Sequence, residues 1–456
     1  MPKKKTALTI EERLQQALVP AEEQPYEVPE NWVWVRLGAI AEIVTGGTPS
    51  KKHPEYYGGN FPFYKPSDLD QGRLTYDASE YLSEEGKKVS RIIPKNSTAV
   101  CCIGSIGKCG YLMCEGTTNQ QINSAIPKIN SLCLYYYLCT ENFVQNLLSM
   151  ASATTIAIVN KSKMESCAFP LPPLSEQQRI VERIEELFAK LDEAKERLQE
   201  AADSFAVRKA AILHKAFTGE LTKQWRRENG VSDESWEEKK LHEVAFVQTG
   251  VMKGKHYNGE TKLLPYLRVA NVQDGYLKLD EIKEIAIDVN LIERYSLRKG
   301  DVLFTEGGDY DKLGRGTVWN NEIPGCLHQN HVFAVRPNTS ILFDCFLAYQ
   351  SNSRYGKKYF LSCSKQTTNL ASINSTQLKN FPVLLPSLPE QHEIVRLIDD
   401  LLACERAAQQ AAEQALASID LMKKSILARA FRGELGTNKA SEASALELLR
   451  QVLAEN

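Results

Sequence analysis

The sequence predicts a duplicated α/β (α+β) fold, in which two mixed globular domains are each followed by one long helix. The first observation is a long repeat, because residues 171–221 and 385–435 align without a gap. The second is a fainter repeat between the segments that precede these two stretches. One supersecondary unit used twice in a single chain explains both. The two long helices are therefore expected to pair antiparallel, as in a coiled coil, about a pseudo-two-fold axis.

Each long repeat is predicted to be one helix, over about residues 175–221 and 387–435. Apolar residues recur in alternating steps of four and three, which is the seam of a coiled coil. A hairpin inside one domain would not separate its helices by so much other structure. Phe188 and Leu402 lie beside the seam, where they either dock partner helices or complete the core of the pair itself. The predicted seam consists of Ile180, Ile184, Leu187, Leu191, Leu198, Phe205, Ile212, Ile394, Ile398, Leu401, Ala408, Ala412, Ile419 and Ile426.

The ends of the two helices carry matching signals. The S-x-x-E/Q spacing predicts a capping box at each start, formed by Ser175 with Gln178 and by Ser387 with Glu390. A glycine follows each helix, and it is expected to adopt the left-handed conformation that closes a helix. These glycines are Gly219 and Gly433.

The predicted domain plan has six parts. An amphipathic helix at residues 10–19 precedes a proline-rich connector, and a short helical patch near 446–453 lies in a tail that is expected to be mobile or bound to a partner. The parts are residues 1–30 (N-terminal helix and connector), 31–170 (first mixed domain), 171–234 (central helical region), 235–382 (second mixed domain), 383–435 (distal helical region) and 436–456 (tail).

The two mixed domains repeat more faintly than the helices. Trp32 matches Trp236, and Lys108 matches Arg315, at corresponding points of the two segments. β-Rich runs at 97–103 and 301–305 alternate with turns and with helical pieces near 132–150 and 341–349. We therefore expect small twisted sheets with helices packed beside them.

Composition limits the class of protein. The chain has 456 residues, of which 43% are hydrophobic and 25% are charged, as in soluble proteins with two or three domains. No apolar run is long enough to cross a membrane, and the basic start lacks the apolar core of a signal peptide. The 11 cysteines show no paired spacing, so reduced thiols and a cytoplasmic location are expected. A net charge of −2 argues against a protein that coats nucleic acid, yet it permits local basic faces.

No catalytic or metal site is predicted from the motifs. The segment Gly104–Lys108 lacks the first glycine of a phosphate-binding loop. Glu281 and Lys283 form an E-x-K fragment of the kind found in nucleases, but a solvated strand face explains it equally. His328 and His331 have the spacing of a ligand pair across a turn, without an evident carboxylate or cysteine partner. What remains is binding chemistry on loops.

Polar and basic residues occur on equivalent loops of the two mixed domains. Lysine and arginine neutralise phosphates, whereas asparagine, glutamine, histidine and arginine can contact base edges. Two such sets on duplicated domains suit a bipartite target along a rod-like polymer. The candidate DNA-binding residues are Thr48, Ser50, Lys51, Lys52, Lys65, Ser67, Ser105, Lys108, Asn119, Gln120 and Gln121 in the first domain, and Lys253, Lys255, Arg268, Asn271, Lys312, Arg315, His328, Gln329, Asn330 and His331 in the second.

Several stretches resemble the specificity subunit of type I restriction–modification systems. They are PENWVWVRLGAIAEIVTGGTPSKK, FPLPPLSEQQRIVERIEELFAKLD, KAFTGEL, LPEQHEIVRLID and AFRGEL. An L-x-E-Q helix opening and an F-x-G-E-L ending both occur twice, and nearly the whole chain follows the regional order of that family. The N-terminal helix and the acidic tail are less typical of it.

The resemblance implies that each mixed domain is a target-recognition domain for one half of a split asymmetric sequence in double-stranded DNA. The helix pair would set the gap and dock two methyltransferase (modification) subunits. Those partners, with endonuclease and translocase (restriction) subunits, would supply S-adenosylmethionine, ATP and Mg²⁺, whereas this chain would bind no cofactor and have no activity alone. Two alternatives stay open: a scaffold that holds two protein partners without touching DNA, and a fused nuclease that uses Glu281 and Lys283.

Overall fold

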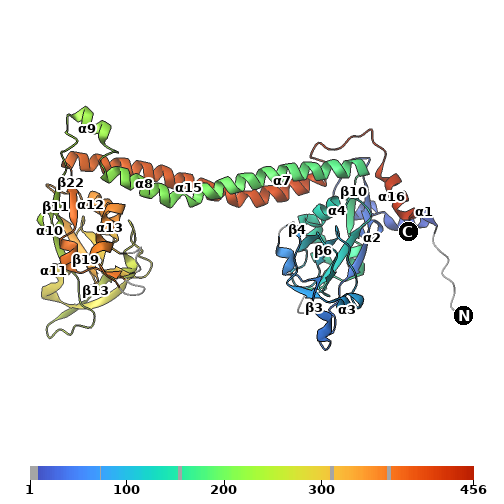
Figure 1. Ribbon diagram of the computed structural model, residues 1–456, viewed down its shortest axis with the longest axis horizontal. Helices are drawn as coiled ribbons and strands as arrows, with labels where there is room; N and C mark the ends of the chain where they lie inside the picture. The colour runs from blue at the N-terminus through green and yellow to red at the C-terminus, as the bar shows by residue number, and fades with distance from the viewer. Residues whose placement is uncertain (1–8, 72, 153–156, 309–312, 367–370, 456) are drawn as a thin grey trace. The chain divides into compact units, whose positions relative to one another are not determined.

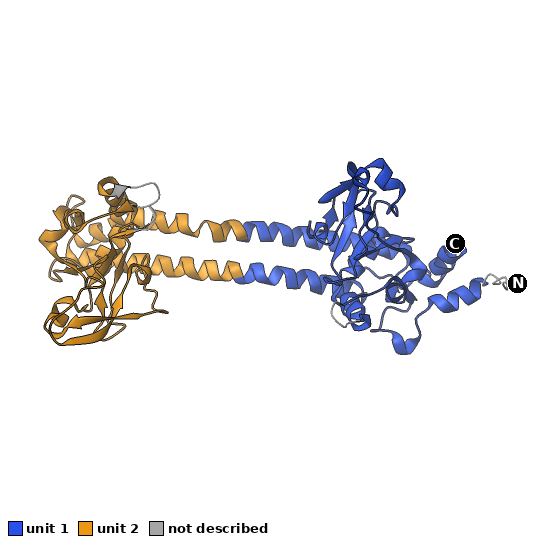
Figure 2. Ribbon diagram, turned by 90° about the horizontal axis from the view of Figure 1, so that it is seen from below, with its two compact units in different colours: residues 1–198, 414–456 blue, residues 199–413 orange. Residues whose placement is uncertain are grey.

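The computed structural model describes residues 9–71, 73–152, 157–308, 313–366 and 371–455 (Figure 1). It divides into two compact units, of which unit 1 contains residues 1–198 and 414–456 and unit 2 contains residues 199–413 (Figure 2). Each unit mixes helices with small sheets, so the predicted duplicated α/β (α+β) fold is confirmed.

Unit 1 has a five-stranded sheet in the order β2-β9-β6-β7-β4 and a three-stranded sheet in the order β5-β3-β8. A two-stranded sheet, β1-β10, pairs the entry of the unit with the strand that leads into the first long helix. Within the three-stranded sheet, β3 and β8 are parallel, with Tyr64 opposite Thr118. The strands are β1 (Val33–Arg36), β2 (Ala41–Thr45), β3 (Tyr57–Tyr64), β4 (Leu74–Thr75), β5 (Glu80–Leu82), β6 (Thr98–Cys101), β7 (Cys109–Leu112), β8 (Thr117–Thr118), β9 (Ile122–Pro127) and β10 (Ala168–Leu171).

Unit 2 repeats this topology apart from β4. Its sheets have the orders β12-β19-β15-β17, β14-β13-β18 and β11-β22, and β16-β21-β20 is an addition. The parallel pair recurs as β13 with β18, where Leu267 lies opposite His328. The sequence repeat is therefore a structural repeat. The strands are β11 (Glu237–Lys240), β12 (Ala245–Thr249), β13 (Thr261–Leu267), β14 (Lys283–Asp288), β15 (Val302–Thr305), β16 (Gly307–Gly308), β17 (Gly316–Val318), β18 (Leu327–His328), β19 (Val332–Pro337), β20 (Lys365–Gln366), β21 (Ala371–Ser372) and β22 (Pro382–Leu385).

Short helices accompany the sheets of both units, and polar side chains define where several of them begin. Asn130 accepts the Cys133 N–H at 3.0 Å at the start of α4, and Thr140 accepts the Phe143 N–H at 3.3 Å at the start of α5. These helices are α1 (Ile10–Ala17), α2 (Leu37–Ile40), α3 (Glu84–Lys88), α4 (Ser131–Leu138), α5 (Glu141–Met150), α6 (Lys161–Glu165), α9 (Lys223–Asn229), α10 (Leu241–Val244), α11 (Ile292–Tyr295), α12 (Asp344–Asn352), α13 (Arg354–Cys363), α14 (Ser375–Lys379) and α16 (Ala445–Ala454), with 3₁₀ turns η1 (Ala21–Glu23), η2 (Pro54–Tyr56), η3 (Asp68–Asp70), η4 (Val269–Asn271) and η5 (Val289–Leu291).

The long helices are α7 (Leu174–Asp203), α8 (Phe205–Phe217) and α15 (Leu388–Ala430). The first repeat was predicted as one continuous helix, but it is interrupted at Ser204. The Ser204 hydroxyl donates to the Ala201 carbonyl at 2.9 Å, a local bond that competes with the helical pattern. Both predicted C-terminal ends were too late by several residues. α7 begins in unit 1 and ends in unit 2, whereas α15 begins in unit 2 and ends in unit 1.

Within each unit the long helices run antiparallel, as predicted. In unit 1 the Arg179 guanidinium donates to the Thr437 carbonyl at 3.0 Å, and further along α7 the Phe188 ring lies 5.3 Å from the Lys423 ammonium. Residue numbers therefore rise along one segment while they fall along the other. In unit 2 the Arg208 guanidinium donates to Glu405 at 2.5 Å and the Thr222 hydroxyl donates to Glu390 at 2.7 Å, so residue numbers again run in opposite directions.

The predicted seam is correct in part. Phe188 and Leu402, which the heptad places beside the seam, are buried in the cores of units 1 and 2. Leu401 is 38% exposed and Ala408 is also exposed, so these two seam assignments are wrong. For Leu401 the reason is that the first part of α15 lies on the core of unit 2, where Leu402 takes the buried position and the buried stripe is broader than a heptad seam. Buried seam residues are Ile180, Ile184, Ile394, Ile398, Ala412 and Ile419, and half-buried ones are Leu187, Leu191, Leu198, Phe205, Ile212 and Ile426.

The predicted capping boxes are wrong, because the polar residues at the helix starts make other bonds. The Gln178 amide bonds Asn130 at 3.0 Å and Glu182 at 3.0 Å. Glu390 is fully buried and accepts the indole N–H of Trp236 at 3.2 Å. Glu176 in the first repeat is likewise buried and accepts the indole N–H of Trp32 at 2.7 Å.

The same two carboxylates fasten the end of one long helix to the start of the other. The Thr222 hydroxyl, just after the first G-E-L sequence, donates to Glu390 at 2.7 Å. The Thr437 hydroxyl, just after the second, donates to Glu176 at 3.3 Å. In unit 2, Arg226 adds an ion pair with Glu390 at 2.8 Å.

The glutamine of each L-x-E-Q opening ties the long helix to its globular domain. Gln177 accepts the N–H of Asn130, which precedes α4, at 3.1 Å, and Gln391 accepts the N–H of Phe343, which precedes α12, at 2.8 Å. Each amide also donates to the carbonyl of the proline five residues earlier, at 2.9 Å in both repeats. Both glutamines are completely buried, so these bonds replace bonds to water.

The predicted left-handed glycines are confirmed, since φ is 77° at Gly219 and 75° at Gly433. The tail, in contrast, is folded against unit 1. The α16 residues Leu449 and Leu453 join the core of that unit together with Leu14 of α1. The apolar face of α16 is therefore covered within unit 1.

Candidate nucleic-acid interface

Four loops of unit 1 meet at one edge of its sheets. The Gly46 N–H, after β2, donates to Ile122 at 3.0 Å, and the Asn119 N–H, after β8, donates to Tyr64 at the end of β3 at 3.1 Å. The Cys102 N–H, after β6, donates to Gln121 at 2.7 Å. The predicted binding loops at 45–52, 65–67, 105–108 and 117–121 therefore belong to one surface region.

Unit 2 gathers the equivalent loops. The Val251 N–H, after β12, donates to His328 at 2.7 Å, and the Gln329 N–H donates to Leu267 at the end of β13 at 2.9 Å. The Glu306 N–H, after β15, donates to His331 at 2.9 Å. The same backbone scaffold thus presents a different set of side chains in each unit.

A glycine makes this loop junction possible in both units. A Cβ atom on Gly46 would lie 2.2 Å from the Asn119 carbonyl oxygen, and one on Gly250 would lie 2.1 Å from the His328 carbonyl oxygen. No side chain fits at either position, because backbone atoms cannot move aside as a flexible side chain can. The T-G dipeptide that repeats in the sequence therefore marks the close approach of two loops.

Some candidate side chains at the edge of unit 1 are exposed, and others already form hydrogen bonds or ion pairs within the unit. Ser50, Lys51 and Lys52 are exposed beyond β2, and the Thr48 hydroxyl donates to Gln120 at 2.6 Å. Ser67 and Ser105 are exposed as well. Two candidate lysines are already paired, Lys65 with Glu80 at 2.8 Å and Lys108 with Asp70 at 2.5 Å. These two must exchange a carboxylate for a phosphate in order to bind DNA.

The edge of unit 2 shows the same mixture. Lys253 and Lys255 are exposed, and the Lys255 ammonium lies 5.3 Å from the Tyr257 ring. The Arg268 guanidinium donates to the Glu281 carbonyl at 3.2 Å, and Arg315 donates to Gln273 at 2.6 Å. His331 is exposed and bonded to Glu306, while Gln329 and Asn330 are half-buried beside it.

Three candidates are buried and hydrogen-bonded within their own unit, so their side chains are not presented on the loop surface in this structure. Asn119 is 7% exposed and its side chain bonds both the N–H and the amide oxygen of Gln121 at 3.0 Å. Asn271 is 3% exposed and its amide donates to the Lys278 carbonyl at 2.9 Å. Polar residues that close a turn have the same composition as residues that read bases, so the sequence alone does not separate them. Lys312 lies outside the described residues.

His328 is the third. It is completely buried, with its Nδ1–H donating to the Val332 carbonyl at 2.6 Å. Burial lowers the pKa of the His328 imidazole to about 4, so the ring is neutral near pH 7. The exposed His331 bonds Glu306 instead, so the two histidines do not converge on one site. Among the described residues no group of three or more His, Cys, Asp or Glu side chains is placed to hold a metal ion.

The structure adds residues that the sequence did not single out. Arg91 donates to the Thr45 carbonyl at the end of β2, which places a further cation at the edge of unit 1. Glu306 places a carboxylate at the corresponding edge of unit 2. A single charged residue in a polar loop has no sequence signal of its own. Only the position of the loop in the fold reveals it.

Glu281 and Lys283 do not have the surroundings of a nuclease centre. Glu281 is 70% exposed at its side chain and pairs with both Arg268 and Lys283 at 3.5 Å, which fits the solvated strand face rather than a nuclease centre. Across the described part of the chain, no helix combines the length and the apolar character needed to span a bilayer.

The family model and the similar proteins that match this chain all belong to type I restriction–modification specificity subunits. Residues 29–202 and 233–415 match the family model described as type I restriction modification DNA specificity domain. The chain is 26% identical to the type I restriction enzyme StySPI specificity subunit of Salmonella potsdam, over 94% of this chain and 96% of that protein. It is 28% identical to the EcoBI specificity subunit of Escherichia coli, over 94% and 93%.

A solved structure shares the fold. The HsdS subunit from Thermoanaerobacter tengcongensis superposes with a TM-score of 0.61 at 19% identity, covering 90% of this chain and 99% of the other. Because the family model matches more than half of the chain, in two copies that correspond to the two repeated domains, this chain belongs to the type I restriction modification DNA specificity family.

Proposed function

We propose that each unit binds one half of a bipartite, asymmetric sequence in double-stranded DNA through its loop edge. The observation that carries this proposal is the duplicated edge itself, where one backbone scaffold presents different polar side chains in the two units. Two identical edges would suit a palindrome, whereas two different edges suit an asymmetric target. Phosphates would be bound by exposed lysines such as Lys51, Lys52, Lys253 and Lys255. Bases would be contacted by His331 and by the side-chain amides of Gln120, Gln121, Gln329 and Asn330.

We further propose that the long helices set the gap between the half-sites and dock two methyltransferase subunits. Support comes from α7 and α15, each of which belongs to both units, and from the buried carboxylates that fasten their ends. A helix advances about 1.5 Å per residue, so helix length converts directly into separation.

In this proposal the chain directs the chemistry of its partners in the cytoplasm. The methyltransferase subunits would bind S-adenosylmethionine, and the endonuclease and translocase subunits would bind ATP and Mg²⁺. None of these groups is assigned to a residue of this chain. A specificity subunit alone would then neither methylate nor cleave DNA.

The proposal is tested by reconstituting the chain with methyltransferase subunits and mapping the methylated positions on genomic DNA. We expect one bipartite motif, with methylation lost when the chain is omitted. A grafted edge, in which residues 46–52 and 117–121 come from a relative, is expected to change one half-site and leave the other intact. A purified chain that cleaves DNA unaided would contradict the proposal and favour a nuclease. A complex that shows no salt-sensitive binding to duplex DNA would contradict it and favour a protein scaffold.

A further inference from the structure

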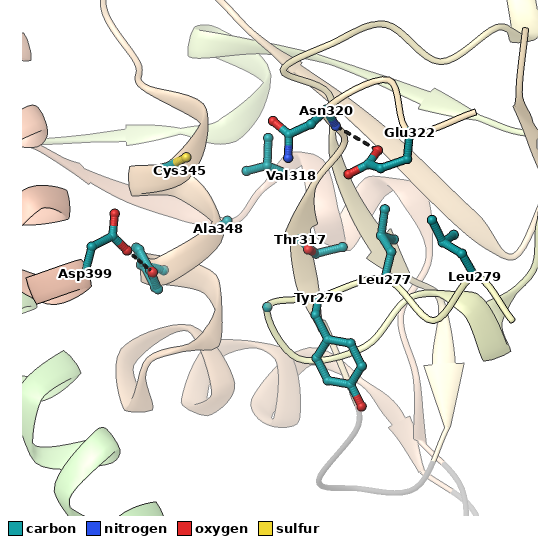
Figure 3. A pocket seen from close by; sticks show the side chains of 12 residues that line it. Tyr276, Leu277, Leu279, Thr317, Val318, Asn320, Glu322, Cys345, Ala348 and Asp399 are labelled. Atoms are coloured by element: carbon teal, nitrogen blue, oxygen red, sulfur yellow. Dashed lines mark hydrogen bonds between the residues drawn. The ribbon is translucent and has the colours of Figure 1, made fainter. Parts of the chain in front are cut away.

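A cavity of about 380 Å³ opens in unit 2 between α12, α15 and the loop that follows η4 (Figure 3). Its walls include Leu277, Val318 and Ala348, and carboxylates lie at Asp399 and Glu322. The volume is within the range of about 300–1,000 Å³ that is typical of small-ligand sites. The cavity is lined by α12, α15, β17 and the loop after η4, and its lining includes none of the candidate DNA-binding residues.

One carboxylate at this cavity, Asp399, forms no ion pair with any cation that the structure describes. The Tyr349 hydroxyl donates to Asp399, and burial together with this bond raises the pKa of the tyrosine, so the phenol stays protonated. Within the described parts of the chain, Asp399 forms no ion pair. Arg406, about two turns further along α15, donates its Nε–H to the Leu402 carbonyl at 3.2 Å, although its charge also acts on the Tyr349 hydroxyl.

Unit 1 contains the same tyrosine and acid, and there a cation is present. Tyr136 and Glu185 occupy the positions of Tyr349 and Asp399 in the aligned repeats, and the Tyr136 hydroxyl likewise donates to the carboxylate. Arg73 completes the group. Its guanidinium lies 3.0 Å from the Tyr136 hydroxyl and 2.8 Å from Glu185.

The repeat also explains why the position is open in unit 2. Arg73 aligns with Tyr276, which is 60% exposed and directed away from Asp399 (Figure 3). Among the described residues of unit 2, no guanidinium therefore pairs with both the carboxylate and the tyrosine hydroxyl as Arg73 does in unit 1.

Two aromatic side chains beside the Tyr136 group in unit 1 are replaced by smaller residues in unit 2. Tyr111 and Tyr135 lie with ring centroids 5.5 Å apart beside Tyr136. The strand register and the helix alignment place Val318 and Ala348 at their positions, and both of these line the cavity. Unit 2 thus keeps the tyrosine and the acid but loses the guanidinium and two aromatic rings.

We propose that the unit 2 cavity binds a guanidinium group carried on an apolar stem. The planar fork would donate to Asp399 and contact the Tyr349 hydroxyl, as Arg73 does with Glu185 and Tyr136. The stem would lie against Leu277, Val318 and Ala348. An arginine side chain of a partner polypeptide and a free alkylguanidinium share this chemistry, and the site does not depend on the proposed DNA binding.

The test is a titration of the full-length chain with n-propylguanidinium. Isothermal titration calorimetry and NMR saturation transfer measure the binding. Saturable binding is expected, with n-propylurea, the neutral isostere, at least tenfold weaker. Asp399→Asn is expected to weaken binding at least tenfold. Asp400→Asn, which removes the neighbouring carboxylate that pairs with Arg396 at 2.7 Å, is the matched control and should leave binding unchanged. Absence of saturable binding, or equal binding by Asp399→Asn, would overturn the proposal.

A second variant keeps the test decisive if Asp399→Asn folds poorly. Tyr276→Arg introduces the unit 1 cation into unit 2, so it is expected to occupy the cavity, to raise the melting temperature and to abolish binding of n-propylguanidinium. Undiminished binding by this variant would count against the site.

A blocked tripeptide with a central arginine, compared with its citrulline analogue, shows whether the guanidinium comes from a polypeptide or from a small molecule. Binding of the arginine peptide at least as tight as that of n-propylguanidinium points to a partner side chain, and binding of the small molecule alone points to a free guanidinium.

Discussion

Arg226 and Glu390 form an ion pair of 2.8 Å in which the two side chains are 6% and 0% exposed. Glu390 also accepts bonds from Thr222 and Trp236, so three donors converge on one buried oxygen. The pair joins the segment after α8 to the first turn of α15. Charge that is withdrawn from water must be matched by such partners, because an unpaired buried charge is costly.

Arg226→Ala is therefore expected to reduce the free energy of unfolding by about 3–5 kcal/mol, since it leaves a buried carboxylate without its cation. Urea unfolding followed by circular dichroism measures this loss. Lys190→Ala removes an exposed pair with Glu186 on α7 and is the control, with an expected change below about 0.5 kcal/mol. Equal effects of the two substitutions would show that burial of the Arg226 pair has no consequence.

His328 predicts a pH dependence of stability. Burial lowers the pKa of this imidazole to about 4 in the folded chain, whereas an unfolded histidine titrates near 6.5. The unfolded state therefore binds the proton first as pH falls, so stability decreases from about pH 6.5 downwards and stops decreasing near pH 4. The slope in this window is about 1.4 kcal/mol per pH unit at most.

His328→Gln is expected to flatten that part of the stability curve, as measured by urea unfolding between pH 4 and pH 8. His256→Gln changes an exposed histidine and should leave the curve as it is. A wild-type stability that does not change between pH 6.5 and pH 4.5 would refute the neutral, buried state of His328.

The free lysines after β2 predict a salt effect. Lys51 and Lys52 are exposed, and no ion pair involves them among the described residues, so they can meet phosphates without losing a partner. The double variant Lys51→Ala/Lys52→Ala should lower the slope of log K against log salt by about 2 in the reconstituted complex, because about 0.9 is contributed by each phosphate. Fluorescence anisotropy on the cognate duplex measures the slope. Lys190→Ala, on α7, serves as the control, and an unaltered slope in the double variant would remove this loop from the interface.

The paired helices predict how the gap between half-sites changes. Seven residues inserted after Glu196 in α7 and seven after Ala417 in α15 add about 10 Å to each helix. At about 3.4 Å per base pair this is about three base pairs, and methylation mapping should show the longer gap with both half-sites unchanged.

An insertion in α7 alone is the informative contrast. It would separate Thr222 from Glu390, so we expect loss of folded protein rather than a longer gap. A complex that carries both insertions and still methylates the original motif would show that the helices do not measure the gap.

Much of the fold follows from repetition in the sequence. Ile180 and Ile394 mark helix faces, and Gly219 and Gly433 mark helix ends, because period and backbone conformation depend on a few local residues. The roles of Glu176 and Glu390 were not predictable in this way. A glutamate near a helix start is typical of a cap. Only the tertiary structure shows that Glu176 and Glu390 are buried and accept the indole N–H groups of Trp32 and Trp236.

The binding edge was predictable as a set of loops but not residue by residue. Lys51 and Asn271 lie in equally polar loops, yet one is exposed and the other closes a turn with 3% of its surface accessible. The difference arises from which loop folds back on itself, and this depends on chain segments far away in sequence. The cavity beside Asp399 had no sequence signal, because it results from three residues that are smaller or turned away in the second repeat.

The way in which the chain is threaded has a consequence for its biosynthesis. Phe431, near the C-terminus, packs 5.1 Å from Tyr137 in the core of unit 1, whereas unit 2 is one uninterrupted stretch that ends at residue 413. During translation the second unit is complete as soon as that stretch has left the ribosome, while the first waits for the last residues to be made. A premature stop codon late in the message would thus damage the unit that was synthesised first.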